Sequence, residues 1–386
     1  MMGPYTSSFW HNLQKPFFVL APMEAVTDVV FRHVVAKAGA PDVWFSEFTN
    51  ATGWVHAGQK AIGGRLIKTD DEQPIVAQIW GGEPGDMEQL ALHCRELGYR
   101  GIDINMGCPA KSAIKSGGSA LIRKPEVAIA AIAAAKTAGL PVSVKTRLGY
   151  TRVDEWREWL TTLLQQDIVN LTIHLRTKKE MSKVPAHFEL IPDIIALRDE
   201  ISPHTLLTIN GDIANREHGL QLVHQFPGLD GIMIGRGVFH DPYCFRSDTP
   251  LHLKTARQNF FEPSERPSPT EGSAFPAERT QENGSWRVRV PEGGDGSEEE
   301  RDSKEAVKEN SDSKEVTTMS DLLNLLHYHL DLFDQWQPKL GRPYETLKRF
   351  FKIYIRDFDG AKDLRDRLMH TKNTSEARDI IKKATS

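Results

Sequence analysis

The segment Asp103-Ile104-Asn105-Met106-Gly107-Cys108-Pro109-Ala110-Lys111-Ser112 places a cysteine in a Gly-Cys-Pro turn directly after a short apolar run. Other polar groups follow apolar runs in the same way, in Ala21-Pro22-Met23, Gln78, Val144-Lys145, Thr172-Ile173-His174, Ile209-Asn210-Gly211-Asp212 and Ile234-Gly235-Arg236. A (β/α)8 barrel keeps its chemistry at the carboxyl ends of its strands. The pattern therefore predicts a TIM barrel with a polar site at one end.

Short β-branched runs alternate with helical patterns between Phe18 and Phe239. The expected strands are Phe18–Leu20, Val43–Phe45, Ile75–Ile79, Gly101–Ile104, Val142–Lys145, Val169–Ile173, Leu206–Ile209 and Gly231–Ile234. The clearest helices are Pro84–Leu97, Pro125–Ala138 and Asp154–Gln165, with proline in the first turn of the first two. Alternation of strands and helices favours an α/β fold with a parallel, closed barrel. An open, doubly wound sheet is the alternative.

The region after the barrel differs in composition. Residues 1–260 carry 27 basic and 27 acidic side chains, residues 261–318 carry 8 and 15, and residues 319–386 carry 13 and 10. The acidic segment is rich in Pro, Gly, Ser and Glu and poor in apolar residues, so it cannot bury enough surface to offset its ordering entropy. We expect a barrel at 1–245, a connector at 246–261 and a disordered acidic linker at 262–318.

Helical periodicity returns at Met319, and residues 319–386 are predicted to form a small all-helical domain. Two apolar stripes run from Leu322 to Phe333 and from Leu347 to Phe358. Basic side chains on the polar side of the second stripe are Lys348, Arg349, Lys352 and Arg356. A basic module favours a polyanionic partner such as RNA, although a solvated helix face is an equal alternative.

The bulk properties exclude several classes. No apolar run is long enough to span a bilayer, and the segment from Met1 to Pro16 has no apolar signal-peptide core, so we expect neither membrane insertion nor export. The chain has three cysteines, and no pair of them has metal-ligand spacing. This usage predicts a reducing compartment, hence a cytoplasmic protein without disulfides or metal. We expect a monomer.

The strand-end polar groups are typical of a flavin site. In flavin barrels the phosphate lies on the loops after the seventh and eighth strands, here Asn210-Gly211-Asp212 and Gly235-Arg236. Lys145, Gln78 and His174 end three other strands, where a cation and hydrogen-bonding groups suit a flavin edge. Glycine loops and strand-end histidines also occur as purely structural features, and the case rests on their convergence.

Cys108 differs from the other cysteines. Cys94 and Cys244 fit small buried hydrophobic positions, whereas Cys108 lies in a glycine- and proline-flanked loop with Asn105 before it and Lys111 behind. A thiol with a pKa near roughly 8.5 is mostly protonated at neutral pH. Cys108 therefore suits a proton donor as well as a nucleophile.

These motifs resemble the bacterial tRNA-dihydrouridine synthases, and the resemblance runs from about Val19 to Phe245 with Asn105-Met106-Gly107-Cys108-Pro109-Ala110-Lys111 as its most specific part. The family is an FMN-dependent barrel that uses NADPH to reduce the C5–C6 bond of uridines in tRNA. The resemblance implies hydride transfer from reduced FMN to C6 and a proton from Cys108 to C5. It also implies that the helical domain, with Leu347-Lys348-Arg349-Phe350, binds tRNA.

Site residues are carried over position by position. FMN contacts implied by the resemblance are Pro22, Met23, Glu24, Gln78, Lys145, His174, Asn210, Gly211, Asp212, Gly235 and Arg236. Substrate or RNA contacts are Asn105, Lys111, Lys115, Arg176, Thr177, Lys348, Arg349, Lys352 and Arg356. Extrusion of the target uracil into the pocket is part of this hypothesis.

Two departures from the family pattern stand out. Leu175 occupies a position that is usually Gly in the family. Its bulkier side chain is expected to narrow the open carboxyl end of the barrel, here called the mouth, near Arg176. The acidic linker is the second departure, and we hypothesise that it competes with RNA for the basic surface. Unchanged tRNA affinity after removal of the linker would contradict that hypothesis.

Three rival functions remain open. An FMN-dependent dehydrogenase of a free pyrimidine, of the dihydroorotate or dihydropyrimidine type, explains the flavin groups but not the basic helices. A non-catalytic tRNA-binding protein explains the helices but not Cys108. A cofactor-free lyase with Lys145 as a Schiff base is the third.

Overall fold

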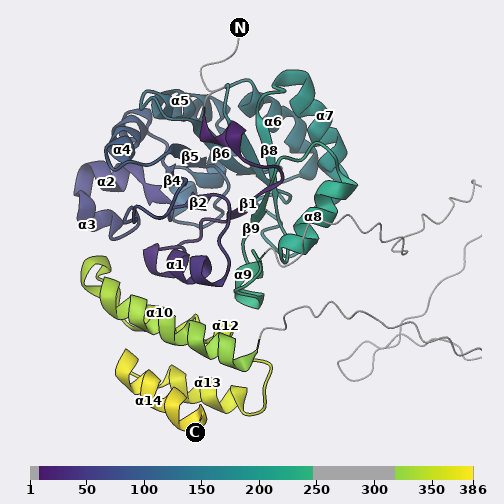
Figure 1. Cartoon of the computed structure of the whole chain (residues 1–386). Coiled ribbons are helices and arrows are strands. Elements are labelled where there is room, and N and C mark those ends of the chain that lie inside the picture. Colours follow the sequence, from purple (N-terminus) through teal and green to yellow (C-terminus); the bar gives the residue numbers. More distant parts are fainter. Residues whose placement is uncertain (1–7, 247–317, 386) are drawn as a thin grey trace, which may run out of the picture. The chain divides into compact units, whose positions relative to one another are not determined.

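The structure is a computed structural model, and it describes residues 8–246 and 318–385 of the chain. Nine strands form one all-parallel sheet (Figure 1). They are β1 (Phe17–Leu20), β2 (Trp44–Phe45), β3 (Thr49–Asn50), β4 (Ile75–Trp80), β5 (Gly101–Asn105), β6 (Val142–Arg147), β7 (Asn170–His174), β8 (Leu206–Asn210) and β9 (Gly231–Ile234). The predicted strands are all present, with bounds that differ by at most two residues from the prediction.

The sheet closes into the predicted (β/α)8 barrel. Its order is β1-β9-β8-β7-β6-β5-β4-β2, and a parallel bridge between Val19 and Val43 joins β1 to the start of β2. Two short strands share the second strand position of the barrel, because β2 pairs with Ile75–Val76 of β4 and β3 pairs with Ile79–Trp80 of the same strand. The irregular turn between the two pieces carries Glu47 at the carboxyl end of β2.

Helices lie between the strands and surround them (Figure 1). They are α1 (Val29–Ala38), α2 (Ala51–Ala57), α3 (Gln59–Ile62), α4 (Pro84–Glu96), α5 (Pro125–Lys136), α6 (Trp156–Leu164), α7 (Ile191–Ile201), α8 (Arg216–Gln225) and α9 (Gly237–His240). Short 3₁₀ turns are η1 (Phe9–Asn12), η2 (Ala113–Lys115), η3 (Gly118–Arg123), η4 (Val153–Glu155) and η5 (Phe188–Leu190). Pro84 and Pro125 occupy the first turns of α4 and α5, as predicted.

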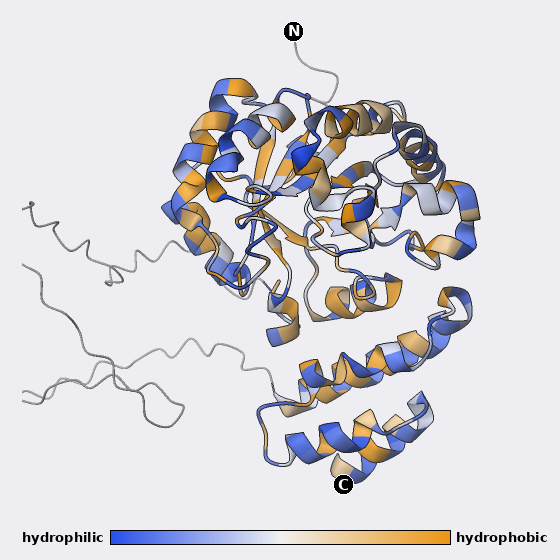
Figure 2. Ribbon diagram, turned by 180° about the vertical axis from the view of Figure 1, so that it is seen from behind, coloured by the Kyte–Doolittle hydropathy of each residue, from blue (hydrophilic) through white to orange (hydrophobic). Residues whose placement is uncertain are grey.

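The barrel interior changes character along its axis. An apolar cluster at the amino ends of the strands includes Phe17, Val43 and Leu206, with Trp10 packed against them. Further along, the inward side chains are polar and hydrogen-bonded to one another; for example, Thr208 Oγ1 donates to Asn170 Oδ1 at 2.8 Å. Figure 2 shows the hydrophobic strands at the centre and mixed colours on the outer helices. This gradient places the polar groups at the carboxyl ends.

The C-terminal residues form five helices, here called the helical domain. They are α10 (Met319–Leu340), α11 (Glu345–Lys348), α12 (Phe351–Tyr354), α13 (Ala361–Met369) and α14 (Thr374–Thr385). Thr318 caps α10 by accepting the Asp321 N–H, and Gly341 in the left-handed conformation ends the helix. The predicted helical domain is therefore present, and the predicted acidic linker lies outside the described residues apart from Thr318.

The second apolar stripe is not one continuous helix. Between α11 and α12, Arg349 and Phe350 keep helical dihedral angles but the hydrogen bonds become i→i+3, from Phe350 N–H to Leu347 O at 3.0 Å and from Ile353 N–H to Phe350 O at 2.9 Å. Phe350 packs there against three aromatic rings. Its ring centroid lies 4.9 Å from that of Phe31 in α1 and 5.0 Å from that of His329 in α10. Phe350 therefore connects this part of the helical domain to both the barrel and α10. Among the described residues, no helix is long and apolar enough to cross a membrane.

Candidate active site

Three side chains from β4 and β5 form a hydrogen-bonded chain inside the barrel mouth. Gln78 Nε2 donates to Asp103 Oδ2 at 2.6 Å, and Asn105 Nδ2 donates to Gln78 Oε1 at 3.0 Å. Burial is the largest influence on Asp103 and raises its pKa to about 6, although the hydrogen bonds from Ser143 and Gln78 oppose it. Asp103 thereby fixes the amide orientation of Gln78, and Gln78 fixes that of Asn105.

Asn105 in turn holds the loop of Cys108. Its Oδ1 accepts the backbone N–H groups of Gly107 at 3.1 Å and Cys108 at 2.9 Å. Cys108 is partly exposed, whereas Cys94 and Cys244 are buried, as predicted. Burial raises the pKa of the Cys108 thiol, and the backbone N–H of Ala110 opposes that effect. At neutral pH the group is a thiol, which can donate a proton.

Lys145 projects from β6 into the same mouth. Its Nζ donates to Asn210 Oδ1 at 3.2 Å, which joins β6 to β8 across the barrel end. Burial and, after it, the nearby Arg147 cation lower the pKa of Lys145 to about 8, while Asp103 opposes both. Lys145 is therefore mostly protonated at pH 7 and offers a cation at the mouth.

His174 at the end of β7 is a neutral imidazole. Burial and the cations Arg147, Lys145, Arg176 and Arg236 hold its pKa well below the usual range. Arg176 Nη1 lies 3.1 Å from His174 Nε2. A guanidinium can only donate, so Nε2 accepts and the ring proton is on Nδ1. His174 thus presents one N–H donor.

The loops after β8 and β9 form the second part of the site. Gly211 has φ 122° and Asp212 has φ 50°, and the Asp212 carboxylate accepts from Arg176, from Arg236 at 3.1 Å and from the Ala186 N–H at 3.0 Å. Within the described residues, no hydrogen bond engages the backbone N–H of Gly211, Gly235 or Arg236. The loops therefore offer free donors beside the Arg236 cation, which suits a phosphate.

The loop after β1 completes the ring of predicted cofactor contacts. Pro22 is buried, Met23 is partly buried, and the Met23 N–H donates to Thr27 Oγ1 at 2.9 Å. Glu24 is exposed and ion-paired with Arg65. The structure therefore brings the residues predicted to contact a cofactor to one end of the barrel.

Arg147 and Thr177 connect two loops of the mouth. Arg147 Nε donates to Gly107 O at 2.8 Å, and its Nη1 donates to Thr177 O at 3.2 Å and Met181 O at 2.9 Å. The Arg147 side chain is 6% exposed. Sequence reasoning missed Arg147, although it lies two residues after Lys145 on one strand and so shares its face.

Leu175 and Arg176 are oriented differently from the sequence-based expectation. Leu175 is fully buried among the apolar residues that join strands to helices, so its side chain does not enter the mouth. Arg176 is 2% exposed and is held by Asp212, His174 and the carbonyl of Val184. Its predicted RNA contact and that of Thr177, which is buried, stay predictions.

A buried charge cluster joins the helical domain to the barrel. Arg342 Nη1 donates to Asp28 Oδ2 at 2.9 Å, and its Nη2 donates to Glu47. Glu47 is fully buried, and burial raises its pKa to about 7 against the opposing effect of Arg342. Sequence reasoning also missed this cluster, which has no local signal because Arg342 lies about 300 residues from each of its two partners.

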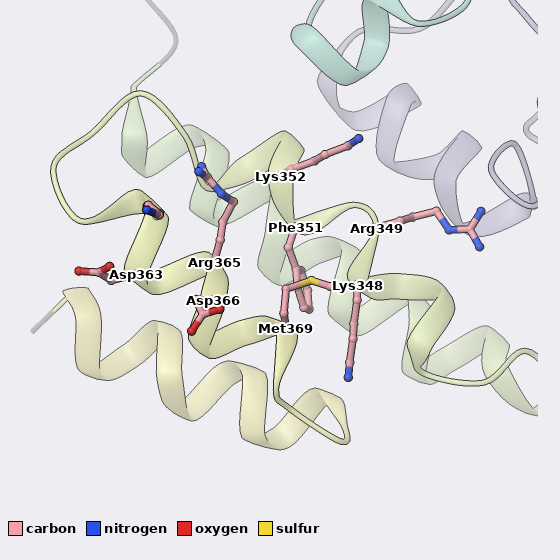
Figure 3. Close-up of a pocket in the computed structure, with 9 residues that line it drawn as sticks. Lys348, Arg349, Phe351, Lys352, Asp363, Arg365, Asp366 and Met369 are labelled. Atoms are coloured by element: carbon pink, nitrogen blue, oxygen red, sulfur yellow. The ribbon is translucent and has the colours of Figure 1, made fainter.

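The predicted RNA-binding cations fall into different surroundings. A pocket of 550 Å³, here called the basic pocket because its cations outnumber its carboxylates, is lined by Lys348, Lys352, Lys362, Arg365, Asp363, Asp366, Phe351 and Met369 (Figure 3). Arg349 borders it too but donates to the Ala25 carbonyl at 3.2 Å, and Arg356 lies 3.4 Å from Asp357. Lys111 and Lys115 are exposed around η2. Lys362 and Arg365 were missed, although their i, i+3 spacing on α13 was visible in the sequence.

The fold and the ring of polar side chains define a barrel enzyme whose chemistry lies at the carboxyl ends of its strands. Residues 19–265 match the dihydrouridine synthase (Dus) family. The chain therefore belongs to this family of oxidoreductases. Within the described residues, no group of three or more His, Cys, Asp or Glu can hold a metal ion.

Similar proteins match over nearly the whole chain. A Bacillus subtilis (strain 168) protein named Probable tRNA-dihydrouridine synthase 2 is 49% identical over 378 residues, covering 97% of this chain and 96% of its own. A Staphylococcus epidermidis (strain RP62A) Probable tRNA-dihydrouridine synthase is 45% identical, with 97% and 95% covered. The Staphylococcus aureus (strain COL) protein of that name is 44% identical, with 97% and 94% covered.

Proposed function

We propose that this protein is a tRNA-dihydrouridine synthase, which reduces the C5–C6 double bond of uridines in tRNA with FMN as cofactor and NADPH as reductant. The observation that carries the proposal is the Cys108 thiol, whose raised pKa keeps it protonated and whose loop is fixed by Asn105. Reduction of uracil needs a proton donor at C5, and a positioned thiol meets that need. The names of the similar proteins describe the same reaction.

The residues of the mouth fit FMN. An FMN phosphate needs N–H donors and positive charge, which the unengaged N–H groups of Gly211 and Gly235 supply beside Arg236. A flavin ring edge needs donors and a cation, which Gln78, Lys145 and the Nδ1–H of His174 can provide. When bound, FMN supplies the hydride that C6 of uracil receives.

The protein's own groups perform the other half of the addition. Cys108 transfers its thiol proton to C5, leaving a thiolate that solvent reprotonates. Asn105 holds the backbone of Gly107 and Cys108, and Arg147 holds the Gly107 carbonyl, so the thiol stays fixed while the substrate enters. These contacts are positioning, and they support a direct proton transfer without loop rearrangement.

The basic pocket of the helical domain is our candidate for tRNA phosphate contacts. Lys348 and Lys352 border it with Lys362 and Arg365 on α13. Phosphate contacts dominate RNA affinity, and basic side chains around a concave surface suit them. Arg349 is a weaker candidate because its guanidinium donates to the Ala25 carbonyl. A cytoplasmic location and a monomeric state complete the proposal.

The decisive experiment uses purified protein, NADPH and an unmodified tRNA transcript. RNA mass spectrometry should find uridines that have gained two hydrogens, and Cys108→Ala should abolish most of them. Cys244→Ala is the matched control, because it removes a buried thiol that lies outside the Cys108 loop. Protein that carries FMN and oxidises NADPH but leaves tRNA unchanged, while reducing a free pyrimidine, would favour the free-base rival. Protein that never retains flavin would favour the non-catalytic rival.

A further inference from the structure

The loops after β6 and β7, together with Arg123 of η3, build a basic surface beside the mouth, here called the Tyr150 platform. It consists of Arg123, Tyr150, Lys178, Lys179, Met181 and Lys183. The Arg123 guanidinium lies over the Tyr150 ring at 4.0 Å from its centroid, and Lys178 Nζ lies over it at 4.8 Å. One aromatic ring therefore gathers two cations from two different segments.

The carboxylates near the platform do not neutralise its lysines. Glu155 accepts the backbone N–H groups of residues 150–152, and Glu180 accepts from the Thr177 N–H at 2.7 Å and contacts His187 at 3.0 Å. Asp154 is paired with Arg152 at 3.0 Å. Across residues 8–246 and 318–385, no ion pair engages Lys178, Lys179 or Lys183. Their charge is thus available to an external anion.

The platform is rigidly linked to the loop of Cys108. Backbone N–H groups of Lys178 and Lys179 donate to the carbonyls of Gly149 at 2.8 Å and Tyr150 at 2.9 Å, which joins the two loops. Arg147 then bridges the Met181 carbonyl to the Gly107 carbonyl, next to Cys108. A group bound on the platform is therefore held at a fixed position relative to the thiol.

The loop after β7, which carries Lys178, Lys179 and Lys183, also exposes apolar side chains. Met181 is 39% exposed and Val184 is 37% exposed, in a stretch that otherwise carries three lysines. Lysines recognise phosphates, and exposed aromatic and apolar side chains contact sugars or unstacked bases. This mixture at the rim of the mouth fits a nucleic-acid strand better than an acidic protein, which would leave the apolar side chains without a role.

We propose that the Tyr150 platform is an RNA-docking surface of the barrel itself, separate from the helical domain, which binds backbone phosphates of nucleotides flanking the reduced uridine. This inference rests on the proposed function, because it takes tRNA as the partner. A uridine must leave its stack to reach Cys108, and a strand anchored on a surface fixed to that loop is presented to the thiol at a constant distance.

The test is a pair of double variants. Lys179→Ala with Lys183→Ala removes two exposed platform charges and leaves the Lys178–Tyr150 contact intact. Lys37→Ala with Arg100→Ala removes two exposed charges from the end of α1 and the residue before β5, near the amino ends of the strands. Binding of an unmodified tRNA transcript is measured by fluorescence anisotropy over a range of salt concentrations, with flavin absorbance and thermal unfolding as folding checks.

The platform variant should bind roughly tenfold more weakly near 0.1 M salt and lose about 1.4 from its salt slope, as expected for two lost phosphate contacts. The KM for tRNA should rise by a similar factor while kcat changes little. Equal affinity of the platform variant and wild type overturns the proposal, as does an equal loss in the control. Because affinity is measured without catalysis, wild-type protein that binds tRNA through the platform but forms no dihydrouridine contradicts the proposed function alone.

Discussion

The barrel mouth and the basic pocket of the helical domain both gather polar side chains, but they hold them in opposite ways. In the mouth, Gln78, Asn105 and Lys145 each have a hydrogen-bond partner from another strand. In the basic pocket, the Lys348 and Lys352 side chains lie over the rings of Tyr344 and Phe239 and, among the described residues, make no hydrogen bond or ion pair. Bond-making chemistry needs fixed geometry, whereas phosphate binding tolerates flexible cations, and the two regions reflect these two demands.

Loss of the thiol should produce the largest effect of any single change. Cys108→Ala is expected to lower dihydrouridine formation by about 10²–10⁴-fold, the usual contribution of a positioned general acid. The measurement is single-turnover RNA mass spectrometry with saturating tRNA. Flavin content and tRNA affinity should stay unchanged, since Cys108 is partly exposed and its loop is held by Asn105. An equal loss in Cys244→Ala would contradict a specific role.

A change in the buried charge cluster between the barrel and the helical domain should give the next largest effect, a loss of stability. Arg342→Met removes one partner from buried Asp28 and Glu47, and loss of one partner of a buried ion pair costs about 3–5 kcal/mol. Calorimetry should show a lower Tm. Glu47→Gln in the same chain should recover part of the loss, because it removes one of the two uncompensated carboxylates. Additive effects of the two changes would show that Arg342 and Glu47 are not coupled.

Substitutions in the basic pocket should have a smaller effect, which is a weaker affinity for tRNA of any sequence. Lys348→Ala with Lys362→Ala is expected to weaken tRNA binding by about tenfold and to flatten its salt dependence, while single-turnover rates at saturating tRNA stay near wild type. Arg356→Ala, whose guanidinium lies beside Asp357, is the matched comparison and should change affinity less. A larger effect of Arg356→Ala than of the lysine pair would reverse our assignment.

The smallest effect is a pH dependence of flavin binding. The pKa of Lys145 lies near 8, so its positive charge is present below that pH and is lost above it. FMN affinity should therefore fall by about fourfold between pH 7 and pH 8.5 if the cofactor needs the cation. Lys145→Met should bind FMN more weakly but with no such fall. Fluorescence titration with FMN between pH 6 and pH 9.5 measures both, and a flat wild-type profile would remove Lys145 from the flavin contacts.

Local patterns explain why the strands and most of the mouth could be predicted. Polar groups such as Lys145 and His174 follow β-branched runs, and parallel strands bring their carboxyl ends together whatever the surrounding helices do. Arg147 could have been found in the same way, because it shares a face with Lys145. The amide orientation of Asn105 could not, because it depends on Gln78 and Asp103 from two strands at once.

The sequence by itself determined the barrel, its polar end, the turn of Cys108 and the presence of a helical domain, because each is encoded within a few neighbouring residues. Only the tertiary structure decided the packing of Phe350 against α1, the burial of Arg176 and the Arg342 cluster. In each case the partner is a side chain or carbonyl from a distant part of the sequence that only folding brings close, so no local pattern encodes the contact. The Tyr150 platform belongs to the same class, since a ring and two cations from three segments meet only in the folded chain.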